Sequence, residues 1–203
     1  MAKNMQPIMK RCRALGISPA VMGYTGNSKR ESNRNPGPQR RSKKSEYALQ
    51  LTEKQKVKFI YGILEKQFRS YYEKAARMKG NTGDELMSII ETRLDNVVFR
   101  LGLANTRREA RQLVNHGHFT VNGKRVNIPS YLVKVGDVIA VCDKSRSSAK
   151  FKKIVEDDKF VAAPKWLEKS KNAPLEGKVI AKPGRDDIDF EVSVNLIVEL
   201  YSK

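Results

Sequence analysis

The sequence contains no long apolar stretch. None of its runs approaches the roughly 18 apolar residues that a membrane-spanning helix needs. The N-terminus carries positive charge without the apolar segment and cleavage site of a secretory signal. We therefore expect a cytoplasmic protein that is neither inserted into a membrane nor secreted. Its 203 residues are enough for one large domain or two small ones.

Cysteine is scarce, with only 2 residues in the chain. Cys12 and Cys142 lie far apart and belong to no CxxC pair, so the sequence predicts two reduced thiols rather than a disulfide. Tetrahedral zinc needs four ligands, and Cys12 has neither a second cysteine nor a histidine nearby. We therefore predict no metal and no other cofactor.

Motifs that carry enzyme chemistry are also missing. The sequence has no P-loop and no GxGxxG stretch. Its two histidines, His116 and His118, have no recognisable nucleophile or carboxylate partner. We therefore predict that the protein is not an enzyme and has no catalytic residue.

Acidic residues are too few to balance the basic ones. The chain has 40 Lys and Arg against 22 Asp and Glu, which gives a formal net charge of +18. Residues 1–46 hold 11 of the basic and 2 of the acidic residues, so half of the excess lies there. Such an excess opposes compaction, and its usual cause is a polyanionic partner. With membranes excluded, nucleic acid is the expected partner.

The first part of the chain lacks the apolar residues of a core. Residues 1–45 combine their positive charge with the Gly, Pro, Ser and Asn content of a loop. We expect a basic N-terminal arm that becomes ordered only against a partner that neutralises it.

Helical patterns occupy residues 46–92. Capping-box spacings predict helix starts at Thr52 and Thr82, and residues 65–79 are rich in helix formers. Apolar residues then recur at three- and four-residue steps, with a break expected near Asp95.

The C-terminal part gives weaker signals. Val, Ile and Tyr residues at helical spacing over 194–201 predict a short helix, although a β-strand remains the alternative. We expect Trp166 to pack between domains and the aspartates of 186–189 to form a solvated turn.

Residues 106–126 predict a helix followed by a hairpin. Thr106 and Glu109 have the spacing of a capping box, and Gly117 can end the helix in a left-handed conformation. Asn122-Gly123 stands between two short apolar segments, which is the pattern of a β-hairpin with a type I′ turn.

Three arginines begin this helix, namely Arg107, Arg108 and Arg111. Positive charge at a helix N-terminus opposes the helix dipole. A phosphate held there would remove the cost and accept charge-assisted hydrogen bonds. A solvated face that keeps the helix soluble is the alternative, but the net charge of the chain favours the phosphate. Lys124 and Arg125 add a second group of basic side chains, on the hairpin.

Residues 93–141, which begin "RLDNVVFRLGLANTRREARQLVNHGHFTVNGKRV", resemble the RNA-binding module named after bacterial ribosomal protein S-four. The flanks "SEYALQLTEKQKVKFIYGILEKQFRSYY" and "NLIVELYSK" resemble the ribosomal protein S-four family itself. The resemblance implies an α+β fold with two folded parts. One is a helical domain at 46–92, completed by 187–203. The other is an RNA-binding α/β domain at 93–186, in which a helix pair precedes a β-hairpin and an antiparallel sheet.

The resemblance implies a structural role on the small ribosomal subunit. Members of the family bind small-subunit ribosomal RNA early in assembly, contact ribosomal protein S-five, and influence decoding accuracy. By position, basic residues at 40–44 would face messenger RNA where it enters the subunit, although they could instead hold ribosomal RNA. Repression of the protein's own operon messenger RNA is a further implication. The alternative is an RNA-binding translational regulator that acts off the ribosome. Many relatives carry a four-cysteine zinc site in the arm, from which this chain departs.

The candidate RNA contacts are basic and polar residues of the arm and of the module. They are Lys10, Arg11, Arg13, Arg40, Arg41, Lys43, Lys44, Arg93, Arg100, Thr106, Arg107, Arg108, Arg111, Gln112, His116, Lys124 and Arg125.

Overall fold

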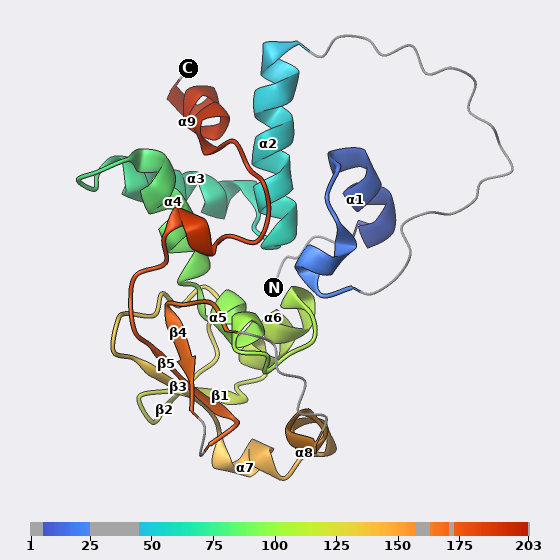
Figure 1. Ribbon diagram of the computed structural model, residues 1–203, viewed down its shortest axis with the longest axis vertical. Coiled ribbons are helices and arrows are strands. Elements are labelled where there is room, and N and C mark those ends of the chain that lie inside the picture. Colours follow the sequence, from blue (N-terminus) through green and yellow to red (C-terminus); the bar gives the residue numbers. More distant parts are fainter. Residues whose placement is uncertain (1–5, 25–44, 157–162, 171–172, 203) are drawn as a thin grey trace, which may run out of the picture. The chain divides into compact units, whose positions relative to one another are not determined.

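The computed structural model describes residues 6–24, 45–156, 163–170 and 173–202. These residues form helices and one five-stranded antiparallel sheet, so the expected α+β class is confirmed (Figure 1). The chain divides into two compact units, Met1–Phe68 with Phe190–Lys203, and Arg69–Asp189.

The first unit is helical. Its elements are α1 (Ile8–Leu15), the short 3-10 helix η1 (Pro19–Met22), α2 (Glu46–Ile60), the first turn of α3 (Glu65–Ala76), and α9 (Val194–Ser202). α9 packs along α2, as Figure 1 shows. The prediction of a terminal helix rather than a strand is therefore confirmed.

Polar and aromatic contacts fix α9 in the first unit. The Gln50 side chain is fully buried, and its Nε2 donates to Glu199 Oε2 over 3.1 Å. The rings of Phe68 and Tyr201 stack with centroids 6.0 Å apart. Residues 133 or more positions apart in sequence thus make one small core, which explains why the C-terminal tail belongs with α2.

The predicted helix start at Thr52 was wrong, whereas the helix predicted to start at Thr82 does begin there, with its cap one residue earlier than expected. α2 begins at Glu46 because the hydroxyl of Ser45 accepts a hydrogen bond from Ala48 N over 3.3 Å. Thr52 lies inside this helix, where its hydroxyl donates to the Ala48 carbonyl over 2.7 Å. α4 (Thr82–Glu91) is capped by Asn81, whose side-chain oxygen accepts a backbone N–H at 2.9 Å. In both places an earlier polar side chain was equally able to cap the helix.

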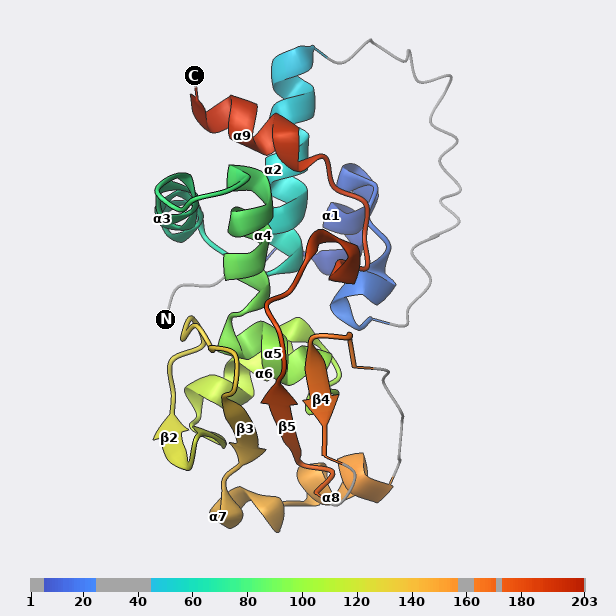
Figure 2. The same ribbon diagram turned by 60° about the vertical axis from the view of Figure 1, so that its left-hand side comes forward.

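The second unit contains the rest of α3, α4 and one sheet with its covering helices. The helices are α5 (Leu94–Arg100), α6 (Arg107–Asn115), α7 (Asp143–Arg146), α8 (Ala149–Glu156) and the 3-10 helix η2 (Arg185–Asp187). The strands are β1 (Phe119–Val121), β2 (Lys124–Val126), β3 (Val138–Val141), β4 (Leu167–Lys169) and β5 (Glu176–Val179). Their order in the sheet is β2-β1-β3-β5-β4, and every neighbouring pair is antiparallel. Figure 2 labels β2, β3, β5 and β4 of this sheet.

The predicted hairpin joins β1 to β2. Asn122 has φ 50° and Gly123 has φ 76°, and Val121 pairs with Lys124 across the turn. Two successive left-handed residues are what a type I′ turn requires. The prediction of this turn is confirmed.

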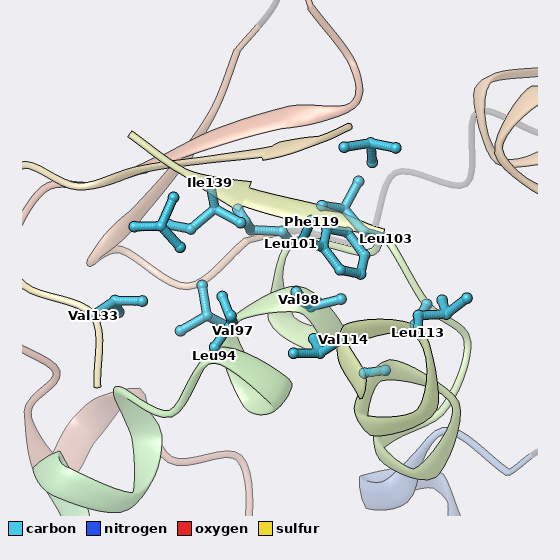
Figure 3. Close-up of a cluster of buried hydrophobic side chains, with 14 of the residues drawn as sticks. Leu94, Val97, Val98, Leu101, Leu103, Leu113, Val114, Phe119, Val133 and Ile139 are labelled. Atoms are coloured by element: carbon cyan, nitrogen blue, oxygen red, sulfur yellow. The ribbon is translucent and has the colours of Figure 1, made fainter. Parts of the chain in front are cut away.

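The core of the second unit lies between the sheet and the α5–α6 pair (Figure 3). Alternate strand residues such as Phe119 and Ile139 point toward Val98 and Val114 of the helices. Trp166 belongs to the same cluster and is 1% exposed, so the expectation that it packs between domains was wrong.

The break in the apolar helical segment falls at Thr92 and Arg93, earlier than the expected position near Asp95. The Thr92 hydroxyl donates to the Ser88 carbonyl, and the backbone N–H of Leu94 donates to the carbonyl of Tyr131 over 2.8 Å.

The two compact units divide after Phe68, whereas we expected a domain boundary at 92/93. α4 belongs to the same unit as the sheet because Glu91, at its end, accepts hydrogen bonds from the side chains of Asn96 and Arg100 of α5.

We predict that Gly177→Val destabilises the protein. A Cβ at Gly177 would lie 2.5 Å from Leu101 Cδ2 in the core, and overpacking of this kind costs about 1–3 kcal/mol. Gly184→Ala is the control, because its nearest neighbour is 3.6 Å away and the change should cost less than about 0.5 kcal/mol. Urea unfolding measures both, and equal losses would contradict this packing.

A second prediction concerns Glu65, which joins α2 to α9. It accepts hydrogen bonds from Lys58, from Lys54 at 3.0 Å and from Tyr201 at 2.6 Å. Burial by itself raises the pKa of Glu65, but the hydrogen bonds outweigh it and lower the pKa from 4.5 to about 2. The ionised carboxylate therefore stabilises the fold above pH 4.5, and this contribution is lost as the pH falls toward 2.

Glu65→Gln should accordingly unfold with a weaker dependence on pH between 4.5 and 2 than the unmodified chain. Glu73→Gln removes an exposed carboxylate from the same helix and serves as the control. Thermal unfolding across this range is the measurement. A Glu65→Gln profile parallel to that of the unmodified chain would show that Glu65 makes no such contribution.

Candidate nucleic-acid interface

The start of α6 has the predicted cap. The Thr106 hydroxyl accepts a hydrogen bond from Glu109 N over 3.1 Å, and Glu109 Oε2 accepts one from Asn105 N over 2.7 Å. Burial alone raises the pKa of Glu109, whereas its bond from Lys150 and the backbone N–H groups lower it, with a net decrease. The Glu109 carboxylate thus binds the backbone just before the helix, and the Thr106 hydroxyl caps the first turn.

Arg107 does not lie on an exposed face. Its side chain is 6% exposed, its Nε donates to Asn96 Oδ1 over 3.1 Å, and its guanidinium lies 4.4 Å from the centroid of the Phe99 ring. Its Nη2 is 4.0 Å from Asp189 Oδ1. The prediction that Arg107 contacts RNA is therefore not supported, because the side chain is enclosed by its own fold.

Asp95 holds two further arginines. Both of its carboxylate oxygens accept from Arg93, at 3.0 and 2.5 Å, and Arg111 Nη1 lies 3.5 Å from Oδ2. Arg93 is 2% exposed and also donates to the Tyr71 hydroxyl over 2.6 Å. Burial lowers the pKa of Arg93, but Asp95 more than offsets it; for Arg111 burial dominates, and the pKa is lowered.

Arg100 is buried in a similar arrangement. Its guanidinium donates to Glu91 over 2.8 Å and to Asp189 over 2.9 Å, and the side chain is 8% exposed. Arg93 and Arg100, both predicted RNA contacts, are thus enclosed by carboxylates of the fold in the free protein. Asp189, which we expected in a solvated turn, is one of these partners.

The remaining candidates of the module are accessible. Arg108, Gln112, His116, Lys124 and Arg125 are exposed, and Arg111 is partly so. They lie on α6 and on the hairpin that follows it. We call Arg108, Arg111, Lys124 and Arg125 the basic set of the module.

Arg125 also has a structural role. Its Nε donates to the Gly117 carbonyl over 2.8 Å and its Nη2 to the His116 carbonyl over 3.1 Å. A cation on the last carbonyl groups of a helix is favourable. Gly117, with φ 71°, leaves room for the guanidinium, since a Cβ there would lie 2.5 Å from Arg125 Nε.

The other candidates belong to the N-terminal part of the chain. Lys10 and Arg13 are exposed on α1, and Arg11 is half-buried beside them. Arg40, Arg41, Lys43 and Lys44 lie outside the described residues.

Sequence reasoning missed the carboxylates that hold the arginines. Glu91 and Asp95 stand within an apolar helical stripe, and each is less than 5% exposed. A buried acid requires a cationic or hydrogen-bonding partner. Their position among apolar residues was therefore a signal that some nearby arginines serve the fold.

Groups typical of other functions were not found in the described part of the chain. It holds no cluster of three or more side chains suited to a metal ion. None of its helices has the length and apolar character to cross a bilayer. Cys12 and Cys142 do not form a disulfide.

A helix pair, a basic hairpin and an antiparallel sheet define this protein as one built around an RNA-binding module. A family described as "S4 domain" matches residues 92–139, and one described as "Ribosomal protein S4/S9 N-terminal domain" matches residues 3–91. Similar proteins named "Small ribosomal subunit protein uS4" occur in Lachnospira eligens, with 55% identity, and Fusobacterium nucleatum, with 52%, each covering all of both chains. That of Acetivibrio thermocellus is 62% identical over 81% of this chain and 79% of its own. The chain belongs to the uS4 family of small ribosomal subunit proteins, which confirms the resemblance.

We predict that Arg125→Ala and Lys124→Ala differ in their effect on stability, although they are neighbours of equal charge. Arg125→Ala removes two hydrogen bonds to the end of α6 and should cost about 1 kcal/mol. The exposed Lys124 side chain makes no hydrogen bond or ion pair within the described residues, so Lys124→Ala should change stability by less than about 0.5 kcal/mol. Urea unfolding compares them. A loss for Lys124→Ala as large as that for Arg125→Ala would contradict the capping role.

Proposed function

We propose that this protein is a structural component of the small ribosomal subunit and binds ribosomal RNA there. The observation that carries the proposal is the exposed basic set of the module, on a chain whose full-length relatives are named for that subunit. The protein performs no chemical reaction.

The mechanism we propose is neutralisation of phosphate charge. Arg108 and Lys124 stand exposed on α6 and on the hairpin, where cations can meet different phosphates of one RNA. Such contacts release condensed counterions and read the position of the backbone rather than the bases. Double-stranded RNA is recognised mainly by its shape. The protein would therefore hold RNA helices in one arrangement where they converge.

Further parts of the proposal follow from the family resemblance. The protein would bind ribosomal RNA early and nucleate assembly of the subunit, contact ribosomal protein S-five and contribute to decoding accuracy. Lys10, Arg11 and Arg13 of α1 supply cations for the RNA from the first unit. Arg40, Arg41, Lys43 and Lys44 would meet messenger RNA as it enters the subunit. Binding to the protein's own operon messenger RNA would use the same basic set.

We predict that Arg108→Ala/Lys124→Ala weakens binding to a small-subunit ribosomal RNA transcript and flattens its salt dependence. Each lost phosphate contact lowers the slope of log K against log salt by about 0.7–0.9. The control is Lys165→Ala/Lys178→Ala, which removes the same amount of charge. Lys178 lies in β5, and Lys165 lies just before β4; both are exposed. Filter binding over a salt series measures both. An equal change in the control would show that total charge, and not this surface, determines binding.

A separate experiment tests the place of action. Tagged protein should sediment with small subunits in stoichiometric amount when a cell extract is fractionated. If the protein binds the transcript but is absent from small subunits, it acts off the ribosome, as a translational regulator would.

A further inference from the structure

Both histidines of the chain lie at the C-terminal end of α6. His116 is exposed, and its ring centroid is 6.1 Å from that of His118. His118 is partly buried with its ring near the edge of Phe151, at 6.0 Å between centroids, and its Nδ1 is 2.9 Å from the Ser145 hydroxyl. The Nε2 atom of His118 has no hydrogen-bond partner among the described residues, which leaves it available to an outside group.

The charged groups around His118 are positive. Arg125 of β2, Lys150 of α8 and His116 each disfavour its protonated form, and together with burial, the largest cause, they lower the pKa of His118 below 6.5. In the described part of the chain neither histidine is bonded to a carboxylate. Glu109 thus offsets the charge of Lys150, whereas Arg125 and the two histidines have no bonded carboxylate among the described residues.

Nearby acids are engaged elsewhere. Glu109 is paired with Lys150. On α7, Asp143 is paired with Arg146, which also binds Glu176. The thiol of Cys142 donates to the Gly117 carbonyl at 3.5 Å. None of these groups provides a counter-charge for His118.

Donors remain free for an anion. Arg125 uses Nε and Nη2 for the end of α6, and a guanidinium carries five N–H donors, so the remaining ones can reach a ligand. The Ser145 hydroxyl can donate to Nδ1 of a neutral His118 or accept from the N–H of a charged one. The hydrogen bond to Ser145 thus tolerates both protonation states, which a carboxylate partner would not.

We propose that His116, His118 and Arg125 form a phosphate-binding site at the C-terminal end of α6, at which His118 takes up a proton when an RNA phosphate binds. The site rests on the proposed function, because its ligand is an RNA phosphate. The proton comes from solvent and adds to Nδ1, whose N–H then donates to the Ser145 hydroxyl, while the Nε2–H donates to a phosphate oxygen. The phosphate supplies the negative charge that the cluster lacks.

The sign of the pH dependence follows from this arrangement. In the free protein, burial and the neighbouring cations disfavour the charged form of His118 and lower its pKa, whereas a bound phosphate favours that form. RNA binding therefore consumes a proton, and affinity must rise as the pH falls through this range. Below the pKa of His118 in the free protein both states are protonated and the dependence ends.

The test measures the affinity of the full chain for a small-subunit ribosomal RNA transcript between pH 7.5 and 6.0 at constant salt. One proton taken up gives at most about tenfold per pH unit, so we expect affinity to rise about 3- to 10-fold over this range. His118→Gln should remove most of this rise. Lys124→Ala, the control, should weaken binding at every pH and keep the rise, because lysine does not titrate in this range.

A second measurement follows the ring resonances of both histidines by NMR in the unmodified chain, with and without the transcript. The transcript should move the titration of His118 to higher pH, and inorganic phosphate should do so more weakly. This experiment decides the matter even if His118→Gln fails to fold.

Two results would overturn the site while leaving the proposed function intact. One is transcript binding that does not change from pH 7.5 to 6.0, with an unmoved His118 titration. The other is a full rise in affinity retained by folded His118→Gln. Failure of the unmodified chain to bind the transcript at any pH would instead contradict the proposed function itself.

Discussion

Buried ion pairs between helices determine which arginines of this protein are enclosed in the fold and which basic side chains remain exposed. Asp95 binds Arg93 and Arg111, and Glu91 binds Arg100, across the ends of α4, α5 and α6. Removing one member of a buried pair leaves an uncompensated charge, which is strongly destabilising. These acids therefore hold α6 and its arginines in a fixed arrangement beneath the sheet, and the position of the hairpin depends on that arrangement.

The cations thus divide into two groups with different tasks. Those enclosed by carboxylates stabilise the second unit, and those exposed on α6 and on the hairpin reach solvent. Arg125 belongs to both groups, since it caps α6 and still reaches solvent. A protein with this division can carry a large positive charge without relying on its partner for the fold of the module.

The sequence predicted correctly those features that depend on residues close together in the chain. The Asn122-Gly123 turn, the cap at Thr106 and the terminal helix depend on neighbouring residues and were correct. Burial depends on residues distant in sequence, so Arg93, Arg100 and Arg107 could not be told from exposed arginines. Asp189 shows the same limit, because its partner Arg100 is 89 positions away. The cap at Thr52 failed because Ser45, another suitable residue, precedes it.

The central claim is that the exposed cations of α6 and the hairpin, and not the buried ones, meet ribosomal RNA. Photo-cross-linking of the protein bound to a small-subunit ribosomal RNA transcript, followed by mass spectrometry of the cross-linked peptides, tests this most directly. We predict cross-links at and beside Arg108, Lys124 and Arg125, and none at Arg93 or Arg100. Cross-links confined to other surfaces of the protein, with this segment unmodified, would contradict the account.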